Sequence, residues 1–352
     1  MILCSPNFLY LEPGRDKQLS AWAVASRLSY FLWGSMPDES LLAAAEDGSI
    51  LRPAVLRKQA ERLLTDARSQ GFVTGFTDSW LALRDLGSMP PDRGQFRHFY
   101  HYDLDAAMRQ ETISFISHLI EQNLSILNCI DSDFTFVNRP LARFYGVTVP
   151  EGTGFEKVML NDDRRGGLLG QASVLTVSAN GIDTSPVVRG VWVLENLLGD
   201  PPQPPPPDVE PLDPDVRGAR TIREQLQKHR QIASCNNCHR SIDPMGFALE
   251  NFDPIGGWRD RYDRKQPIDA SGVLPDGRRY DSIAEFRRIL LTRREQFARA
   301  LTGKLLSYAT GRHLTTSDRP QIDRIVRDVA KADYGMRELI LRVVASETFL
   351  EP

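Results

Sequence analysis

Three residues near the middle of the chain combine types and spacing that can do redox chemistry. They are Cys235, Cys238 and His239, in the run Cys-Asn-Asn-Cys-His. This C-x-x-C-H pattern is the attachment motif of covalent c-type haem. Two thiols three positions apart can each bond to one vinyl group of the same haem, and the adjacent imidazole can then reach the iron as its proximal axial ligand. The pattern therefore predicts a haem site with His239 bound to iron.

Other chemistries are open to the same residues. The two cysteines could form a redox or structural disulfide, or all three residues could be ordinary packed side chains. The cysteines could also join His229 in a zinc site with two cysteine and two histidine ligands. A zinc ribbon usually brings a second short-spaced pair, which this chain lacks, and a thioredoxin-like motif should follow a strand rather than a helix. Haem is the favoured prediction.

Composition sets broad limits on the class of protein. The 352 residues are 41% hydrophobic and 25% charged, with a formal net charge of -3, which is typical of a globular protein with two or three domains. So mild a charge gives no electrostatic case for nucleic acid or for a membrane surface. No run of eighteen apolar residues is present, so no transmembrane segment is expected. The remaining cysteines, Cys4 and Cys129, are isolated and are predicted to be small buried hydrophobes.

The N-terminal residues conflict with the cellular compartment that the haem motif implies. The stretch 1–16 lacks the basic and long apolar regions of a signal peptide. Haem is attached to C-x-x-C-H motifs outside the cytoplasm, so we expect this sequence to be the C-terminal part of a longer exported protein, located in the periplasm or cell envelope.

Hydrophobic periodicity predicts a mainly α, multi-helical fold with a cytochrome c-like haem-binding segment and a small irregular β hairpin. We expect a helical domain at 1–150, a haem-binding domain at 151–290 with a Pro-rich strap at 201–207, and a C-terminal helical domain at 291–352.

Local signals place some of the element boundaries. Ser185-Pro186 and Thr221 have the features of helix starts, and 267–280 is rich in turn residues and predicts the hairpin. The run 131–138 is expected to be a loop, and Asp243-Pro244 is expected to stop the helical path after the motif.

The residues that follow the motif can surround the haem. Phe247 is a candidate for its apolar wall, and Trp258 and Arg259 are candidates for contact with the haem propionates. The sixth iron ligand is open: His313 and Met336 are candidates, because they lie far enough downstream to reach the distal side. Met245 is too close to His239 for that role and is expected to pack in the core.

Several long phrases resemble a known family. They include SRLSYFLW, DSDFTFVNRPLARFYGV, RRGGLLGQASVLTVSANGIDTSPVVRGVW, SCNNCHRSIDPMGFALENFDPIGGWR, IDASGVLPDG and KLLSYATGRHL. Together they resemble the large exported cytochrome-type proteins of planctomycetes, which consist of several consecutive domains of unknown function. The resemblance covers nearly the whole chain and implies that a signal peptide, an upstream cytochrome domain and further helical domains precede Met1 in complete members.

Three functional hypotheses follow. The first is a haem c electron-transfer module that exchanges electrons with a redox partner protein or with an upstream cytochrome domain. The second is a dihaem peroxidase-like or dehydrogenase-like oxidoreductase that uses a second haem from that upstream part. The third is a structural or binding protein in which the motif holds zinc or a disulfide. Enzymatic activity is left open, and no nucleotide or hydrolase motif is present.

Overall fold

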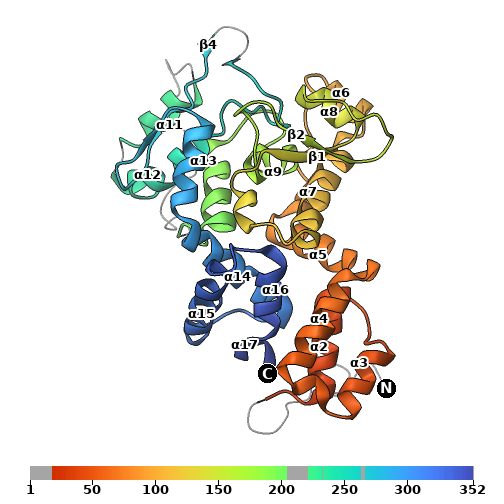
Figure 1. Cartoon of the computed structure of the whole chain (residues 1–352). Coiled ribbons are helices and arrows are strands. Elements are labelled where there is room, and N and C mark those ends of the chain that lie inside the picture. Colours follow the sequence, from red (N-terminus) through yellow and green to blue (C-terminus); the bar gives the residue numbers. More distant parts are fainter. Residues whose placement is uncertain (1–17, 204–220, 232, 263–265, 352) are drawn as a thin grey trace, which may run out of the picture. The chain divides into compact units, whose positions relative to one another are not determined.

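The computed structural model describes residues 18–203, 221–231, 233–262 and 266–351 (Figure 1). This part of the chain is mainly α-helical and contains small two-stranded antiparallel sheets, which confirms the predicted mainly α fold with a small β hairpin. None of its helices has the length and apolar character needed to cross a lipid bilayer. The predicted Pro-rich strap lies outside the described residues from position 204 onward.

The helices and strands follow one another along the chain as short elements joined by turns. The helices are α2 Ala21–Trp33, α3 Glu39–Glu46, α4 Pro53–Thr65, α5 Gln70–Trp80, α6 Arg97–His101, α7 Leu104–Glu121, α8 Arg139–Tyr145, α9 Ala172–Val177, α10 Pro186–Trp192, α11 Ile222–His229, α12 Ala233–Phe247, α13 Ile283–Thr292, α14 Arg294–Thr310, α15 Arg319–Ala330, α16 Met336–Val344 and α17 Glu347–Leu350. The strands are β1 Phe134–Val137, β2 Glu156–Met159, β3 Arg261–Tyr262, β4 Gln266–Pro267, β5 Gly272–Val273 and β6 Arg279–Tyr280.

The chain divides into two compact units, and neither is continuous in sequence. Unit A comprises Met1–Trp80, Phe115–Ile126 and Ala298–Pro352. Unit B comprises Leu81–Ser114 and Leu127–Phe297. The division therefore falls within helices α7 and α14, which each contribute to both units.

Aromatic rings from both ends of the sequence form the centre of unit A. Phe31 of α2 lies 5.0 Å from Phe72 of α5 and 6.0 Å from Phe349 of α17, measured between ring centroids. Tyr308 of α14 meets Phe76 edge-on at 5.5 Å. Such aromatic pairs add about 0.5–1.5 kcal/mol each beyond the area that they bury. The first and last helices of the described chain thus share one core.

Hydrogen bonds join the same two ends of the chain. The Leu19 amide donates to the carbonyl of Leu350 over 2.9 Å. The Arg27 guanidinium, which is nearly buried, donates to the carbonyls of Phe349 and Glu351, each over 2.6 Å. Burial lowers the pKa of Arg27 to about 10.

Unit B has its own core beside the β1–β2 pair. Buried side chains from α6 and the residue before it, from α7, α8, α9 and both strands, and from the segment after α12 meet there: Phe96, Phe99, Leu104, Ala107, Met108, Val137, Leu141, Ala142, Val158, Ala172 and Ile255. The strands pair antiparallel, with Phe134 opposite Met159 and Val137 opposite Glu156. The expectation of a loop throughout 131–138 is therefore wrong for 134–137. Phe134 and Val137 are buried, and pairing with β2 satisfies the backbone between them.

The predicted helix starts are confirmed. The Ser185 hydroxyl accepts a hydrogen bond from the amide of Val188, and Pro186 occupies the first turn of α10. The Thr221 hydroxyl caps α11 by accepting from the amide of Glu224. The turn-rich segment 267–280 contains the β5–β6 hairpin, as expected, and β4 at its start pairs with β3.

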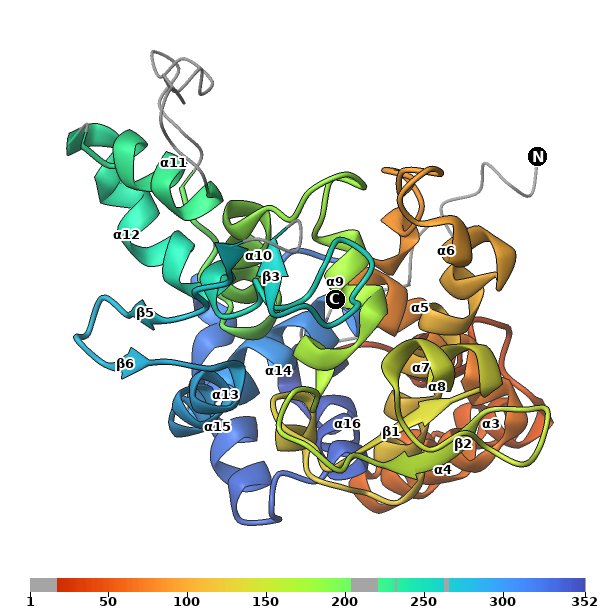
Figure 2. The same cartoon turned by 90° about the horizontal axis from the view of Figure 1, so that it is seen from above.

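Helix α12 packs very closely against α10. A Cβ atom at Gly190 would overlap the carbonyl of Ile242, and one at Gly246 would overlap the carbonyl of Pro186. Both views show α12 beside α11 as well (Figures 1 and 2). Helix α12 includes Pro244 and continues to Phe247, so the expected stop at Asp243-Pro244 is wrong. The close packing on α10 holds the helix in place beyond the proline.

One buried arginine organises the segment after α12. Arg189 of α10 is completely buried, and its guanidinium donates to the carbonyls of Leu249, Phe252 and Asp253 over 2.7–2.8 Å. These bonds satisfy backbone oxygens that no regular helix or sheet would use. The chain that leaves the C-x-x-C-H helix is thereby fixed to the helix on which α12 packs.

Candidate functional site

The motif residues occupy one face of α12. Cys235, Cys238 and His239 stand three and four positions apart on a helix, a spacing that places their side chains on the same side. Cys235 is 9% exposed, and Cys238 and His239 are half-buried. Both motif cysteines are thiols rather than partners in a disulfide. The face therefore presents two thiols and one imidazole together.

A buried carboxylate orients the imidazole. His239 Nδ1 lies 2.8 Å from Asp243 Oδ1, one helical turn further on. The side chain of Asp243 is fully buried, while that of His239 is 13% exposed. When Nδ1 carries the hydrogen of this bond, Nε2 keeps its lone pair for a metal. An imidazole held in this way can serve as a metal ligand through Nε2.

The second oxygen of Asp243 marks this part of α12 as a candidate functional site. Asp243 Oδ2 is buried and has no hydrogen-bond partner. An unsatisfied buried acceptor destabilises the fold by about 1–3 kcal/mol, and such groups gather at functional sites. With two thiols and an imidazole whose Nδ1 is engaged, the residues have the chemistry that c-type haem attachment needs.

His229, the proposed fourth zinc ligand, lies beside His239. The two rings meet edge to face with centroids 4.8 Å apart. The pKa of His229 is lowered, because partial burial and the neighbouring His239 both disfavour its charged form. Among the residues that the structure describes, no three His, Cys, Asp or Glu side chains are grouped to hold a metal ion. The geometry gives the zinc alternative no support.

Phe247 ends α12 and is nearly buried. Its ring lies under the guanidinium of Arg223, which is 3.9 Å from the ring centroid. This cation–π contact joins α11 to the end of α12. A role for Phe247 in a haem wall stays a prediction.

Trp258 and Arg259 lie together in the segment that Arg189 organises. Trp258 meets Phe252 edge-on at 5.2 Å, and its indole nitrogen donates to Asp260. The Arg259 guanidinium donates to the Thr184 hydroxyl over 3.0 Å and lies 3.8 Å from the Glu250 carboxylate. Both residues are half-buried and already have protein partners, so contact with haem propionates also stays a prediction.

The two candidates for the sixth ligand belong to the other compact unit. Cys235, Cys238 and His239 are in unit B, whereas His313 and Met336 are in unit A. His313 is exposed, and Met336 is completely buried at the start of α16. For both His313 and Met336 the role of axial ligand stays a prediction. Met245 is 1% exposed, which agrees with its expected place in the core.

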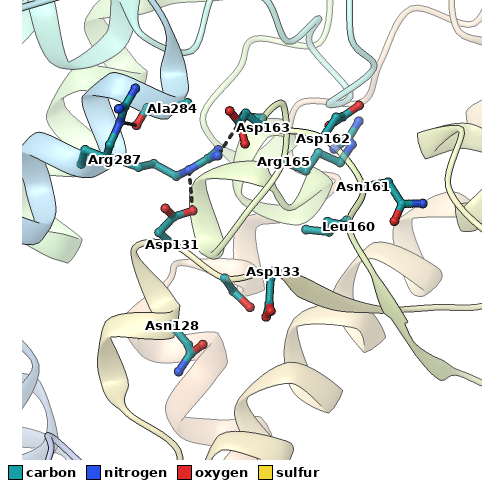
Figure 3. A pocket seen from close by; sticks show the side chains of 12 residues that line it. Asn128, Asp131, Asp133, Leu160, Asn161, Asp162, Asp163, Arg165, Ala284 and Arg287 are labelled. Carbon is teal, nitrogen blue, oxygen red and sulfur yellow. Dashed lines mark hydrogen bonds and ion pairs between the residues drawn. The ribbon is translucent and has the colours of Figure 1, made fainter.

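Unit B also holds a polar cavity that the sequence analysis did not single out. Its volume is about 630 Å³. Four aspartates line it: Asp131 and Asp133 come before β1, and Asp162 and Asp163 come after β2 (Figure 3). The pairing of β1 with β2 brings the two acidic pairs together, and their D-x-D and N-D-D runs were the signal available in the sequence.

Buried arginine offsets part of this acidity. Arg287 of α13 is 2% exposed, and its Nε lies 2.8 Å from Asp131 Oδ1. It also donates to the carbonyl of Asp163 over 2.8 Å (Figure 3). Burial lowers the pKa of Arg287, and the neighbouring aspartates oppose that shift. The cavity is thus a mixed-charge space with its charges partly paired.

The fold and the site together define a mainly helical protein with a C-x-x-C-H motif on one helix. Three family models match consecutive parts of the chain, each described as a protein of unknown function: DUF1592 at 19–147, DUF1588 at 165–262 and DUF1585 at 276–349. The chain belongs to the proteins that carry these families in this order, the planctomycete-type cytochrome c-like multidomain arrangement. This confirms the resemblance, and the motif falls in the second match.

A search of the curated proteins gives no match, and a search of the solved structures gives none either.

Proposed function

We propose that this chain is the c-type haem-binding electron-transfer module of a larger exported redox protein. One observation carries the proposal: Cys235, Cys238 and His239 share a face of α12, and a buried carboxylate holds Nδ1 of the histidine. The three consecutive family matches support the wider cytochrome c-like context. Haem bound here would supply a one-electron carrier.

The chain's own residues would then have separate tasks. Cys235 and Cys238 would hold the haem through two thioether bonds, and His239 would offer Nε2 to the iron. Helix α10 fixes α12 through Gly190 and Gly246, so the three side chains keep their spacing. The electrons would pass to or from a redox partner protein or an upstream cytochrome domain, in the periplasm or cell envelope.

Haem attachment is tested by fusing a signal peptide to the chain and co-expressing it with c-type maturation machinery. The purified protein is denatured, and its pyridine haemochrome spectrum is recorded. We expect a c-type band that stays with the polypeptide in the wild type and in Cys129→Ala, which changes a buried thiol outside the motif. The Cys235→Ser/Cys238→Ser double variant should lose the band. A wild-type protein without covalent haem would contradict the proposal.

A dihaem peroxidase-like or dehydrogenase-like oxidoreductase is the second candidate. The observation that favours it is the Asp243–His239 pair, because a carboxylate on the proximal imidazole increases electron donation to the metal. Carbon monoxide binding to the reduced protein and turnover of peroxide distinguish it from a pure electron carrier. An absence of both reactions leaves the electron-transfer module.

A further inference from the structure

The contact between His239 and Asp243 differs from a pair on an exposed helix surface in its burial and in the packing around it. The distance from His239 Nδ1 to Asp243 Oδ1 is 2.8 Å, and the carboxylate is completely buried. The frame around the pair is also rigid, because α12 meets the backbone of α10 at Gly190 and Gly246. The imidazole therefore faces one fixed acceptor.

A purely structural explanation of this pair is weak. A pair four positions apart on an exposed helix stabilises it by only about 0.2–0.5 kcal/mol. Burial of a carboxylate acts in the opposite direction, and Asp243 Oδ2 has no hydrogen-bond partner to offset it. Replacing a buried charged pair by apolar residues of similar size is often neutral or stabilising, so the pair is not needed for stability alone. The place of Asp243 is better explained by what it does to His239.

The effect on the imidazole follows from its two nitrogens. Free neutral imidazole exchanges its hydrogen between Nδ1 and Nε2, but a carboxylate at Nδ1 holds the hydrogen there. The lone pair then stays on Nε2, and the polarised N–H bond makes Nε2 a stronger electron donor. A stronger donor stabilises the oxidised form of a bound iron more than the reduced form.

We propose that Asp243 is a positioning residue that fixes the Nδ1–H tautomer of His239 and lowers the reduction potential of the haem iron that His239 ligates. The part about the potential rests on the proposed function, whereas the part about the tautomer concerns the chain alone. The two parts therefore need separate measurements.

The tautomer is measured on the full chain without haem, produced in the cytoplasm with ¹⁵N-labelled histidine. The two ring nitrogens have distinct NMR shifts, and His239→Gln identifies the signals that belong to His239. We expect Nδ1–H in the wild type and a shift toward Nε2–H in Asp243→Ala. Identical tautomers in both proteins would overturn this part, whether or not the chain ever binds haem.

The potential is measured by redox titration of the haem-loaded protein. Asp243→Asn, close to isosteric, should raise the potential and lower the iron–histidine stretching frequency in the Raman spectrum of the reduced form. Asp243→Glu, which keeps a carboxylate, should bring the potential and the stretching frequency part of the way back to the wild-type values. Asp318→Asn is the matched control, because Asp318 is a buried aspartate of unit A that pairs with Arg312. It should reduce stability and leave the potential unchanged.

An unchanged potential and Raman band in Asp243→Asn would make Asp243 a structural residue. A wild-type protein that takes up no haem would end the claim about the potential together with the proposed function, while the NMR result would still decide the tautomer.

Discussion

Glu111 is a carboxylate that the fold encloses completely. It lies on α7, with one oxygen 2.6 Å from the Thr135 hydroxyl and the other 2.5 Å from the Tyr145 hydroxyl. Burial raises the pKa of Glu111 to about 7, and the two hydroxyl hydrogen bonds only partly oppose that shift. Burial and the adjacent carboxylate also raise the pKa of Tyr145. The two groups connect α7 to β1 and α8.

The raised pKa of Glu111 makes stability depend on pH in a defined direction. The folded state holds the proton more tightly than the unfolded state, so the contribution is full at acidic pH and is lost as the pH rises toward 7. Glu111→Gln removes this dependence. The free energy of unfolding of the variant minus that of the wild type should increase by up to about 3 kcal/mol between pH 4.5 and 7.5.

Urea unfolding at several pH values measures this difference. Glu121→Gln, at the exposed end of the same helix, is the matched control and should follow the wild type. A Glu111→Gln difference that stays constant with pH would show that the pKa of Glu111 is the same in the folded and the unfolded protein.

Some residues of the site could be predicted from the sequence, and others could not. Cys235, Cys238 and His239 were identified because their chemistry is encoded in adjacent positions. Asp243 was missed, since its contact requires helical backbone as far as Asp243, where a stop was expected before Pro244. Glu111 and the aspartates of the cavity were missed because their partners lie far away in sequence.

The contact of α12 with α10 depends on glycine rather than on side-chain packing. At Gly190 and Gly246 the neighbouring carbonyl occupies the position that a Cβ atom would need. Backbones can approach this closely only where no side chain separates them. Gly190 and Gly246, which carry no functional group, therefore let α12 lie this close to α10.

Gly246→Ala should destabilise the protein by about 1–3 kcal/mol or more, because the new methyl group must push α12 away from Pro186. Gly303→Ala is the matched control: its Cβ would have only an ordinary contact with Leu314, and alanine favours the helix. Thermal unfolding followed by circular dichroism compares the two. Equal melting temperatures for Gly246→Ala and the wild type would mean that α10 and α12 are not tightly packed.

Elements with local signals were predicted well, and elements that need distant partners were not. Helix starts at Ser185 and Thr221 follow from capping residues that act within one turn. Strand β1 has only four residues, and its partner β2 begins nineteen positions after β1 ends, so no local pattern marked either strand. The predicted hairpin was found because its turn residues and both of its strands lie in one short segment.

At the scale of the whole molecule, the family segments and the compact units do not coincide. The first match covers 19–147, yet unit A takes only part of it and adds 298–352 from the region of the third match. The predicted domains at 1–150, 151–290 and 291–352 follow the order of the matches, but stay predictions about independent folding. The physical link is the ring cluster that joins Phe31 to Tyr308 and Phe349.

This division predicts which fragments fold. A fragment limited to 19–147 should lack cooperative unfolding, because it loses the part of the unit A core that 298–352 supply. A fragment of 81–297 contains all of unit B and should unfold cooperatively. Calorimetry of both fragments and of the full chain tests this. A cooperative transition in the 19–147 fragment would show that the first family segment is a domain by itself.

Because the ribosome makes the chain from its N-terminal end, unit B and unit A are completed at different times. Every residue of unit B has been made when the ribosome reaches position 297, whereas unit A must wait for the final helices. Until then the apolar surfaces around Phe31 and Phe72 lack Tyr308 and Phe349, and such surfaces are where newly made chains aggregate or bind chaperones. The α2–α5 segment is thus made before unit B, yet its core is completed after unit B.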